Sequence, residues 1–484
     1  MIKKVQTELG NLVKSSGLAL EDSVPSYGKD WNFIVLAEKS MSSDKLHVPD
    51  KSLVYVGESL ATDKIYIHGD GILYVESELQ CSLVKVSGKG AVIFNKSAVQ
   101  YYGGDIWMKS GLVMARTGNN FRIHIADKGA VFCGGDNRDY IEGGTLLGAF
   151  IRGNQTGAVS TYGASEATSK LLIEGLLEGD LRFKQSLNAI IKGNIRGQID
   201  VDKNLALEGK ELIDSDISAG GTIDIKLFST TQLAEKTRSI QGKGGSIQIA
   251  QNNICDVITA GDLKFTVGRS NKGLVKSGGS ITYVVAGDQE GNIACDKDLD
   301  LSATNLTGDM LVKGSASIKV GNAIKSDNFD VGKDAFIRAR SLEGRARVAG
   351  KIDLEAATLL SSYLFNAIKV GGGTMKVNGD AKVNIHTVGD AEIKVTGQCF
   401  NDIIIGGAGN IDIGARSNGR LHIAKGGSIR VGEDCIGPVY VGGDCPQFTC
   451  RDLHSSLTVA GEARKIQIRT NVKTPYDDAS IDFA

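Results

Sequence analysis

The sequence predicts an all-β fold, a parallel β-solenoid with short helical caps and inserts. Between residues 374 and 443, pairs of apolar residues flank one polar residue, and each such unit is a strand of about three to five residues. Gly, Asn and Asp fill the gaps as tight turns require, and the gaps are too short for crossover helices. Of five prolines, none lies between Pro49 and Pro438, which is typical of a chain whose strands pair on both sides. A short strand that cannot bury its face alone must stack on its neighbours.

The spacing of these units indicates the size of one coil. The repeated units occupy 375–377, 383–385, 393–395, 403–405, 411–413, 421–423, 429–431 and 439–441. Their starts are 8 or 10 residues apart, so two strands take roughly 18–20 residues and a third face would bring the coil to roughly 27–29. Two-sided and three-sided coils both remain open. A right-handed, three-faced helix is favoured because right-handed crossovers dominate in parallel sheets.

Three regions follow along the chain. Residues 1–50 form an N-terminal cap and a loop-rich lead-in, 51–470 form the solenoid, and 471–484 form a C-terminal tail. The start of the first region has apolar residues on one helical face, at Ile2, Val5, Leu9, Leu12 and Val13. This pattern predicts a cap that covers the open first coil, since an uncovered coil exposes a sheet edge. A partner-binding or membrane-surface helix is the alternative.

Three stretches interrupt the repeat. Gly, Thr, Ser and Ala dominate 141–170, which predicts a long loop. A pattern resembling a capping box at Ser229–Gln232 predicts a short helix within 229–240. The range 355–365 is a third candidate helical insert. Gly-Asp pairs precede several strands, where the Asp side chain is expected to accept hydrogen bonds at a corner.

Composition excludes several classes of protein. The net charge is −1, so the chain lacks the basic character of a nucleic-acid-binding protein. No apolar stretch approaches the length of a transmembrane helix, which needs roughly 18 residues or more. The N-terminus lacks the apolar region of a signal peptide, so we expect a cytoplasmic protein or one exported without a classical N-terminal signal. Several of the eight cysteines, such as Cys133, occupy inward strand positions and are expected to be small buried residues, and we expect a reducing compartment. No phosphate-binding or dinucleotide motif occurs, and no cofactor is expected.

Two pairs of carboxylates face outward on predicted strands, at Asp200 and Asp202 and at Asp298 and Asp300. Two residues along a strand span about 6.6 Å, near the separation of an inverting glycosidase pair. These carboxylates are either a catalytic pair or ordinary residues of a solvated strand face, and we expect the solvated face.

Two further clusters have residue types that bind ligands. Tyr101, Tyr102 and Trp107 concentrate aromatic side chains, which contact partners or glycans unless they fill the core. Near the C-terminus, potential zinc ligands follow the spacing C-x9-C-x4-C-x3-H, and we expect structural cysteines there rather than a metal site. These residues are Cys435, Cys445, Cys450 and His454.

The short strands with Gly, Asn and Asp corners resemble two families, the bactofilins and the solenoid shafts of filamentous-haemagglutinin-type adhesins. The resemblance is architectural and includes no family-specific motif. It implies a structural or interaction protein that assembles with itself or binds a partner or surface without catalysis. The alternatives are a polysaccharide-active β-helix enzyme, a lyase or a tailspike-like glycoside hydrolase, and a non-catalytic glycan-binding adhesin. The expected partner is therefore a protein, either a second copy or another chain, with polysaccharide as the alternative.

Overall fold

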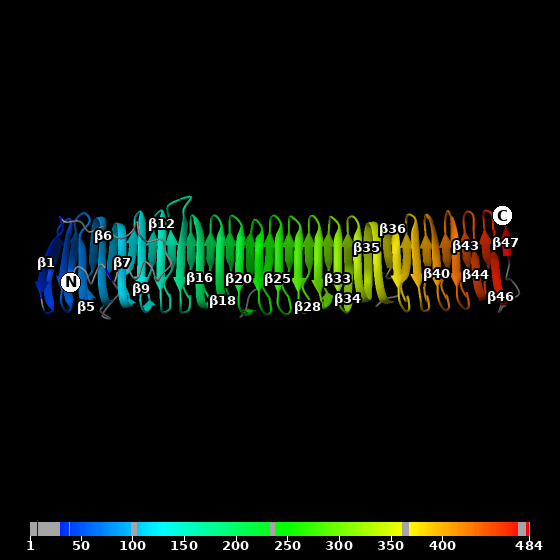
Figure 1. Cartoon of the computed structure of the whole chain (residues 1–484), viewed down its shortest axis with the longest axis horizontal. Coiled ribbons are helices and arrows are strands. Elements are labelled where there is room, and N and C mark those ends of the chain that lie inside the picture. Colours follow the sequence, from blue (N-terminus) through cyan, green and yellow to red (C-terminus); the bar gives the residue numbers. More distant parts are fainter. Residues whose placement is uncertain are drawn as a thin grey trace. The chain divides into compact units, whose positions relative to one another are not determined.

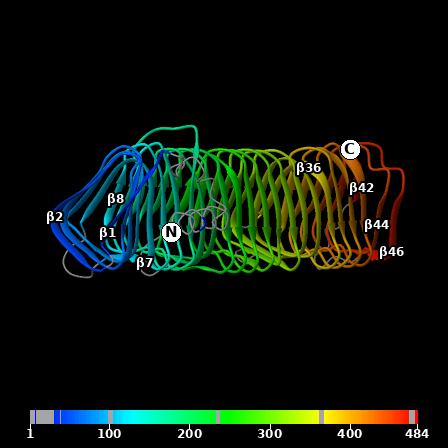
Figure 2. The same ribbon diagram turned by 60° about the vertical axis from the view of Figure 1, so that its left-hand side comes forward.

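The computed structural model describes residues 7, 30–37, 39–97, 104–232, 238–360, 367–472 and 481–483. From residue 30 onward, every regular element in this part of the chain is a β-strand, and the strands pair in parallel. The chain divides into two compact units, Met1–Ala250 and Gln251–Ala484. Each unit is a parallel β-solenoid, so the all-β, parallel-solenoid part of the predicted fold class is confirmed. Figures 1 and 2 show the strands of each unit stacked coil upon coil.

The strands of the first unit are β1 (Asn32–Ala37), β2 (Met41–Val48), β3 (Ser52–Val56), β4 (Leu60–Ile67), β5 (Ile72–Gln80), β6 (Leu83–Ser97), β7 (Asp105–Asn119), β8 (Arg122–Ile125), β9 (Lys128–Cys133), β10 (Asp136–Asn137), β11 (Ile141–Gly143), β12 (Leu146–Ile151), β13 (Val159–Thr161), β14 (Thr168–Ile173), β15 (Leu181–Phe183), β16 (Ser186–Ile195), β17 (Ile199–Val201), β18 (Leu205–Ile213), β19 (Ile217–Ala219), β20 (Ile223–Leu227), β21 (Thr231–Gln232), β22 (Ser239–Gly242) and β23 (Gly245–Ile249).

The strands of the second unit are β24 (Asp256–Thr259), β25 (Leu263–Val267), β26 (Val275–Ser277), β27 (Ile281–Val285), β28 (Asp288–Gln289), β29 (Ile293–Cys295), β30 (Leu299–Ala303), β31 (Asn305–Thr307), β32 (Met310–Val312), β33 (Ala316–Val320), β34 (Ala323–Val331), β35 (Ala335–Leu360), β36 (Ala367–Val377), β37 (Asn384–Thr387), β38 (Ala391–Val395), β39 (Ile403–Ile405), β40 (Ala408–Ile413), β41 (Leu421–Ile423), β42 (Gly426–Val431), β43 (Val439–Val441), β44 (Phe448–Leu453), β45 (Leu457–Val459), β46 (Ile466–Val472) and β47 (Ile481–Phe483).

One coil of the second unit takes 18 residues over much of its length, as the pairing of Ile403 with Leu421 and the hydrogen bond from the N–H of Arg420 to Asp402 show. The spacings of 8 and 10 residues therefore complete a whole coil, and the expected length of roughly 27–29 residues is wrong. The third position of pairing is a single residue in many coils, as in the bridges that join Cys399, Ser417 and Cys435, and two residues in others, such as β28 and β31. A face of the coil that consists of one residue cannot show an apolar-polar-apolar pattern, so the spacing of such patterns along the sequence did not reveal this face.

Each unit thus has three ladders of paired strands. In the first unit, the long-strand ladder contains β3, β5, β9, β12, β14 and β20. The short-strand ladder contains β8, β11, β13, β15, β17 and β19. The bridge ladder contains the single residues Asn137, Gln155 and Leu177. Several longer strands, such as β6 and β7, bend round a corner and join more than one ladder. Alternate side chains point into the coil and form its core.

The core is a stack of aliphatic side chains in register. Ile393 on β38 pairs with Met375 on one side and Ile411 on the other, and all three side chains are no more than 1 % exposed. Burial of one such side chain contributes about 1.5–3 kcal/mol. The outward neighbour Lys394 is exposed and pairs with Asp412. Seven of the eight cysteines are buried, which confirms the expectation that several of them fill the core, and all eight are free.

The Gly-Asp pairs form corners, but the Asp side chain reaches the next coil rather than the next residues of its own turn. Oδ1 of Asp390 accepts a hydrogen bond of 2.8 Å from the backbone N–H of Ala408, 18 residues later. Asp180 and Asp380 do the same with Gln198 and Gln398. These carboxylates therefore join successive coils at a corner where the ladder hydrogen bonds pause.

The long loop predicted over 141–170 is wrong. Strands β11, β12 and β13 lie within this range, β14 begins in it, and all four pair in register, so the loop shrinks to residues 162–167 (Figure 1). Small residues dominate this range because its coils turn tightly. Within 229–240, residues 231–232 and 239–240 are strand and 233–237 lie outside the described residues. Within 355–365, residues 355–360 continue β35 and the rest lie outside the described residues.

Both ends of the predicted solenoid also move. The lead-in contains β1 and β2, so paired strands begin at Asn32 rather than near Leu53. The tail contains β47, which pairs with β45. The predicted N-terminal helix over 2–15 lies outside the described residues, apart from Thr7. Among the residues that the structure describes, no helix is long and apolar enough to span a membrane.

Candidate functional site

The first strand of the first unit, β1, has one edge with no partner among the described strands. β1 pairs with β3 in parallel, and no other described strand pairs with it. Its six residues, Asn-Phe-Ile-Val-Leu-Ala, include no charge and no proline. Phe33, Val35 and Leu36 are 40 %, 50 % and 38 % exposed. Natural proteins usually protect such edges with charges, proline or a bulge, and an unprotected apolar edge is a template for pairing with another chain.

The last coil of the second unit is also open on one side. β46 pairs only with β44, and β47 pairs only with β45, among the described strands. Ile466 and Ile468 alternate with exposed polar residues and remain partly exposed, whereas inward side chains elsewhere in the ladder are buried. Among the described residues, these two terminal coils therefore present strand edges without a described partner beside apolar side chains.

Trp107 is 49 % exposed on the short-strand ladder of the first unit, whereas Tyr101 and Tyr102 lie outside the described residues. The indole stacks on the ring of His124 in the next coil, with centroids 4.1 Å apart and an interplanar angle of 11°. Nδ1 of His124 lies 2.9 Å from Oε2 of Glu142 in the coil after that. The stacked face of the indole is thus occupied by His124, and a sugar ring has no access to it.

The same stacking of outward rings on adjacent coils recurs elsewhere. His422 and Tyr440 stack with centroids 4.8 Å apart, and His47 and Tyr66 with centroids 5.2 Å apart. Aromatic pairs across neighbouring strands stabilise a sheet. The arrangement of Trp107 is therefore that of a sheet-stabilising pair on an exposed face rather than of a core residue, and its contact with a partner or glycan stays a prediction.

The first carboxylate pair lies on an exposed strand face. Asp200 is opposite Arg182 in the neighbouring coil, and Asp202 pairs with Lys184 at 3.2 Å. Both partners of that ion pair are about half exposed, so the charges are solvated and compensated. Nothing desolvates either carboxylate in the way that a general acid requires.

The second pair lines a concavity of about 700 Å³ on the outer surface of β27, β30, β33, β35 and β36. Oδ1 of Asp298 accepts a hydrogen bond of 2.8 Å from the N–H of Ser315, which makes it a corner residue. Asp353, in the same concavity, pairs with Arg338 at 3.1 Å. The guanidinium of Arg338 also lies 3.9 Å from the ring centroid of Phe336. Oδ1 of Asp334, which also lines the concavity, is likewise a corner acceptor, for the N–H of Lys351 at 2.7 Å. Among the described residues, Asp300 is therefore the one carboxylate of the concavity with neither an ion pair nor a corner hydrogen bond, whereas a glycosidase uses two.

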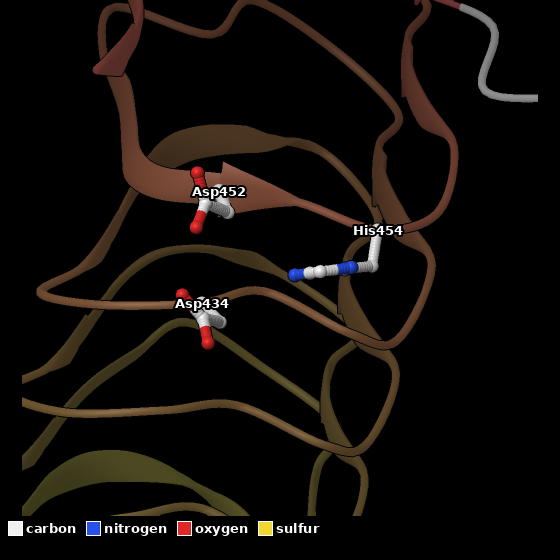
Figure 3. Close-up of side chains that lie close together, drawn as sticks. All are labelled: Asp434, Asp452 and His454. Carbon is white, nitrogen blue, oxygen red and sulfur yellow. The ribbon is translucent and has the colours of Figure 1, made fainter. Parts of the chain in front are cut away.

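Among the described residues, no three of the four potential zinc ligands lie close enough together to hold a metal ion. Burial raises the pKa of Cys435 to about 12 and that of Cys450 to about 11, so both remain protonated thiols at neutral pH. Burial also raises the pKa of Cys445. A metal binds the thiolate form, which these environments disfavour. His454 is instead directed towards Asp434 and Asp452 (Figure 3).

Asp434, Asp452 and His454 form a cluster that the sequence did not indicate, because its members belong to adjacent coils. Their potential ligand atoms lie within 4.8 Å of one another. However, Oδ1 of Asp434 accepts hydrogen bonds of 2.7 and 3.2 Å from Arg451, and Oδ2 accepts one of 3.2 Å from Arg416. The hydrogen bonds to Asp434 also raise the pKa of Arg451. Two guanidinium groups thus neutralise the carboxylates, which makes this an ion-pair network rather than a cation site.

A second feature that the spacing concealed is a pair of buried amide ladders. Nδ2 of Asn253 donates to Oδ1 of Asn271 at 2.6 Å, and Nδ2 of Asn271 donates to Oε1 of Gln289 at 2.9 Å. The same Asn-Asn-Gln order recurs in the first unit, at Asn119, Asn137 and Gln155. All six side chains are no more than 1 % exposed. Recurrence of Asn or Gln at intervals of 18 residues is the signal that would have shown both the ladders and the coil length.

In comparisons with known proteins, no protein-family model, no curated protein and no solved structure matches the chain. A function is therefore proposed from the geometry described above.

Proposed function

We propose that this protein is a structural β-solenoid that assembles end to end with further copies of itself. The observation that carries the proposal is the free edge of β1, which is uncharged and apolar and pairs on one side only among the described strands. Exposed apolar side chains on a β-strand favour pairing with another strand, since pairing satisfies the backbone groups and removes the side chains from water. The partner is therefore a second copy of this chain.

The open last coil of the second unit supports the same proposal. A copy that ends in β46 and β47 offers unpaired backbone groups of its own, so end-to-end contact can pair strands from both copies. A heterologous contact of this kind need not close and can propagate into a filament. We also propose that the coil is right-handed and three-faced, as the rule for parallel crossovers favours.

A polysaccharide-active enzyme has less support from the candidate residues. Asp202 and Asp298 are engaged in an ion pair and a corner hydrogen bond, and the stacked face of Trp107 is occupied. The proposal is accordingly assembly without catalysis.

The test is Val35→Lys with Val284→Lys as its matched control. Val35 is 50 % exposed on the free edge strand β1, whereas Val284 is 45 % exposed on β27, which pairs on both sides. A lysine on an edge strand discourages edge-to-edge pairing. We expect Val35→Lys to weaken association by about ten-fold or more, equivalent to about 1.4 kcal/mol, and Val284→Lys to leave it unchanged.

Association is measured by sedimentation velocity over a dilution series, with negative-stain electron microscopy of the same samples. A wild-type protein that stays monomeric throughout the series would contradict the proposal. So would equal weakening by both substitutions, because the effect would then come from charge rather than from the edge.

A further inference from the structure

Three basic side chains line a concavity of about 810 Å³ on the side of the second unit. They are Arg345 and Arg347 on β35 and Lys369 on β36, and all three are exposed. Arg347 pairs in register with Lys369, so the two cations occupy facing outward positions on adjacent coils. Like charges that face each other across neighbouring strands destabilise a sheet unless an anion compensates them.

Another pair of facing cations in this unit is compensated by carboxylates. Lys376 pairs in register with Lys394, but Nζ of Lys376 lies 2.9 Å from Oε1 of Glu355. Nζ of Lys394 lies 3.8 Å from Oδ2 of Asp412. Among the described residues, the basic side chains of the concavity form no such ion pair, although ion pairs occur on the coils around it. The concavity therefore differs from the rest of this surface in its uncompensated positive charge.

The neighbours of the two arginines leave this charge in place. Asp330 faces Arg347 from the preceding coil, and no ion pair joins these two described residues. Arg345 donates a hydrogen bond to Oδ1 of Asn328, which is a neutral group. Among the described residues that line the concavity, three are cations and one, Asp330, is an anion. An excess of positive charge remains.

The histidine on the far side of Lys369 is exposed to this positive charge. Lys369 pairs in register with His386. Burial lowers the pKa of His386, and the charges of Lys369 and Arg420 lower it further, whereas Asp402 acts in the opposite direction. His386 is therefore mostly neutral at pH 7 and does not add to the cationic site. The basic character of the site comes from groups that stay charged across the physiological range of pH.

Small residues make the surface hollow beside the cations. Ala349 and Gly371 directly follow Val348 and Val370, which pair in register. A Cβ atom at Gly371 would lie 2.5 Å from the backbone oxygen of Ala349, so the close approach of the two coils requires glycine. On the next coil Val388 is 82 % exposed and lines the same concavity. An occupant would thus meet cations on one side and an apolar side chain on the other.

These features define the chemistry of the occupant. A concavity of this size suits an organic molecule rather than a single oxyanion. The guanidinium fork recognises a planar carboxylate or a sulfate through paired hydrogen bonds. None of the described lining residues is aromatic, whereas single-stranded nucleic acids bind by stacking their bases on aromatic rings. An extended peptide binds along a free sheet edge, and the strand at Arg347 is paired on both sides.

We propose that this concavity binds an acidic saccharide, whose carboxylate or sulfate group lies between Arg347 and Lys369 and whose ring packs against Val388. The site binds and positions the saccharide without cleaving it. The proposal does not rest on end-to-end assembly, because its residues lie on the side of the second unit and none of them belongs to a terminal coil.

The test is isothermal titration calorimetry of the full chain at low ionic strength. The probes are a hyaluronan hexasaccharide, which carries carboxylates, a heparin hexasaccharide, which also carries sulfates, and the methyl ester of the hyaluronan hexasaccharide, which carries no charge. We expect at least one acidic hexasaccharide to bind and the methyl ester not to bind. Arg347→Ala and Lys369→Ala should each weaken binding about ten-fold, as loss of a hydrogen bond to a charged group predicts. Val388→Ser should weaken it several-fold.

Lys264→Ala is the matched control, because Lys264 is exposed on β25 and also has no ion pair among the described residues. This substitution changes the net charge equally and should leave binding unchanged. Lack of binding by both acidic hexasaccharides would overturn the proposal, and so would equal weakening by Lys264→Ala.

Two competitors distinguish the remaining occupants. Hexaglutamate that binds as tightly as the hexasaccharides would show a site for acidic peptides and overturn the proposal. Inorganic phosphate that binds as tightly, together with no effect of Val388→Ser, would show an adventitious ion only and overturn it as well. All titrations are repeated in Val35→Lys protein, so that a failure of end-to-end assembly does not affect the result.

Discussion

The buried amide ladder of the second unit allows a stability prediction with a worked magnitude. Asn271→Asp keeps the shape of the side chain and replaces its amide group with an acceptor. Nδ2 of Asn271 donates to the backbone oxygen of Gly273 at 2.8 Å and to Oε1 of Gln289 at 2.9 Å, and both hydrogen bonds are lost when the new group is ionised. Each is worth about 1 kcal/mol net, so the loss alone costs about 2 kcal/mol.

The pH dependence follows from the surroundings of the introduced carboxyl. Burial and two facing acceptors disfavour its charged form, so its pKa in the folded protein is raised above the unfolded value of about 3.9. The folded state then binds more protons than the unfolded state, and stability falls as pH rises above about 4 until the folded pKa is passed. Each unit of pKa shift adds about 1.4 kcal/mol to the loss. We expect a loss of about 1–2 kcal/mol at pH 4, where the protonated group still donates once, and of about 4–5 kcal/mol at pH 8.

Ser417→Ala is the matched control, because Ser417 occupies an inward position of the bridge ladder in the same unit. Its buried Oγ has no hydrogen-bond partner among the described residues, so its removal should leave stability unchanged or slightly higher. Urea denaturation followed by circular dichroism at pH 4 and pH 8 measures both variants beside the wild type. Equal midpoints for the two variants at pH 8, or an Asn271→Asp midpoint that does not fall with pH, would refute the reasoning.

Three further predictions concern the core, the thiols and the corners. Ile393→Asp should unfold the protein or make it insoluble, because an unpaired buried charge costs several kcal/mol, whereas Lys394→Asp on the outer face should be tolerated; equal melting by circular dichroism would contradict the assignment of faces. Because burial raises the pKa of Cys435 to about 12, this thiol should resist alkylation by iodoacetamide at pH 8 in the folded protein and react in urea. Chelation of metal ions should leave the melting temperature unchanged. Stoichiometric zinc that is lost on Cys435→Ser would show instead that the thiol binds a metal. Asp390→Ala removes the hydrogen bond to the N–H of Ala408 and should cost about 1–2 kcal/mol, read from urea midpoints; a neutral result would show that water replaces the carboxylate.

Much of the fold could be read from strands with two inward residues, because alternation of apolar and polar side chains is a local property of a β-strand. The strand around Ile393 and the strand around Leu421 are of this kind. Small residues in 141–170 and helix-compatible residues in 355–360 misled the same reasoning. In both stretches the pairing of neighbouring coils decides the conformation, and tertiary context overrides local propensity.

The candidate site was less accessible to sequence reasoning than the fold. The carboxylates at Asp200 and Asp298 could be named as exposed, but their engagement with neighbours is set by residues one coil away. The cluster of Asp434 with His454 likewise depends on which coils are adjacent. A spacing of 18 residues, such as that between Arg416 and Asp434, places partners side by side only when the coil length is known. That length was not evident from the apolar pattern.

By itself, the sequence determined that short parallel strands stack into a solenoid, because apolar-polar-apolar units with tight corners have no other way to bury their inner faces. It also determined which side chains fill that core, such as Ile393 and Ile411. Only the tertiary structure decided that one coil closes in 18 residues through a single bridging residue, that β1 pairs on one side only among the described strands, and that the outward side chains from Tyr55 to Phe150 are buried. These features depend on which coils and segments meet in space, and contacts between residues far apart in the chain leave no local pattern from which they could be read.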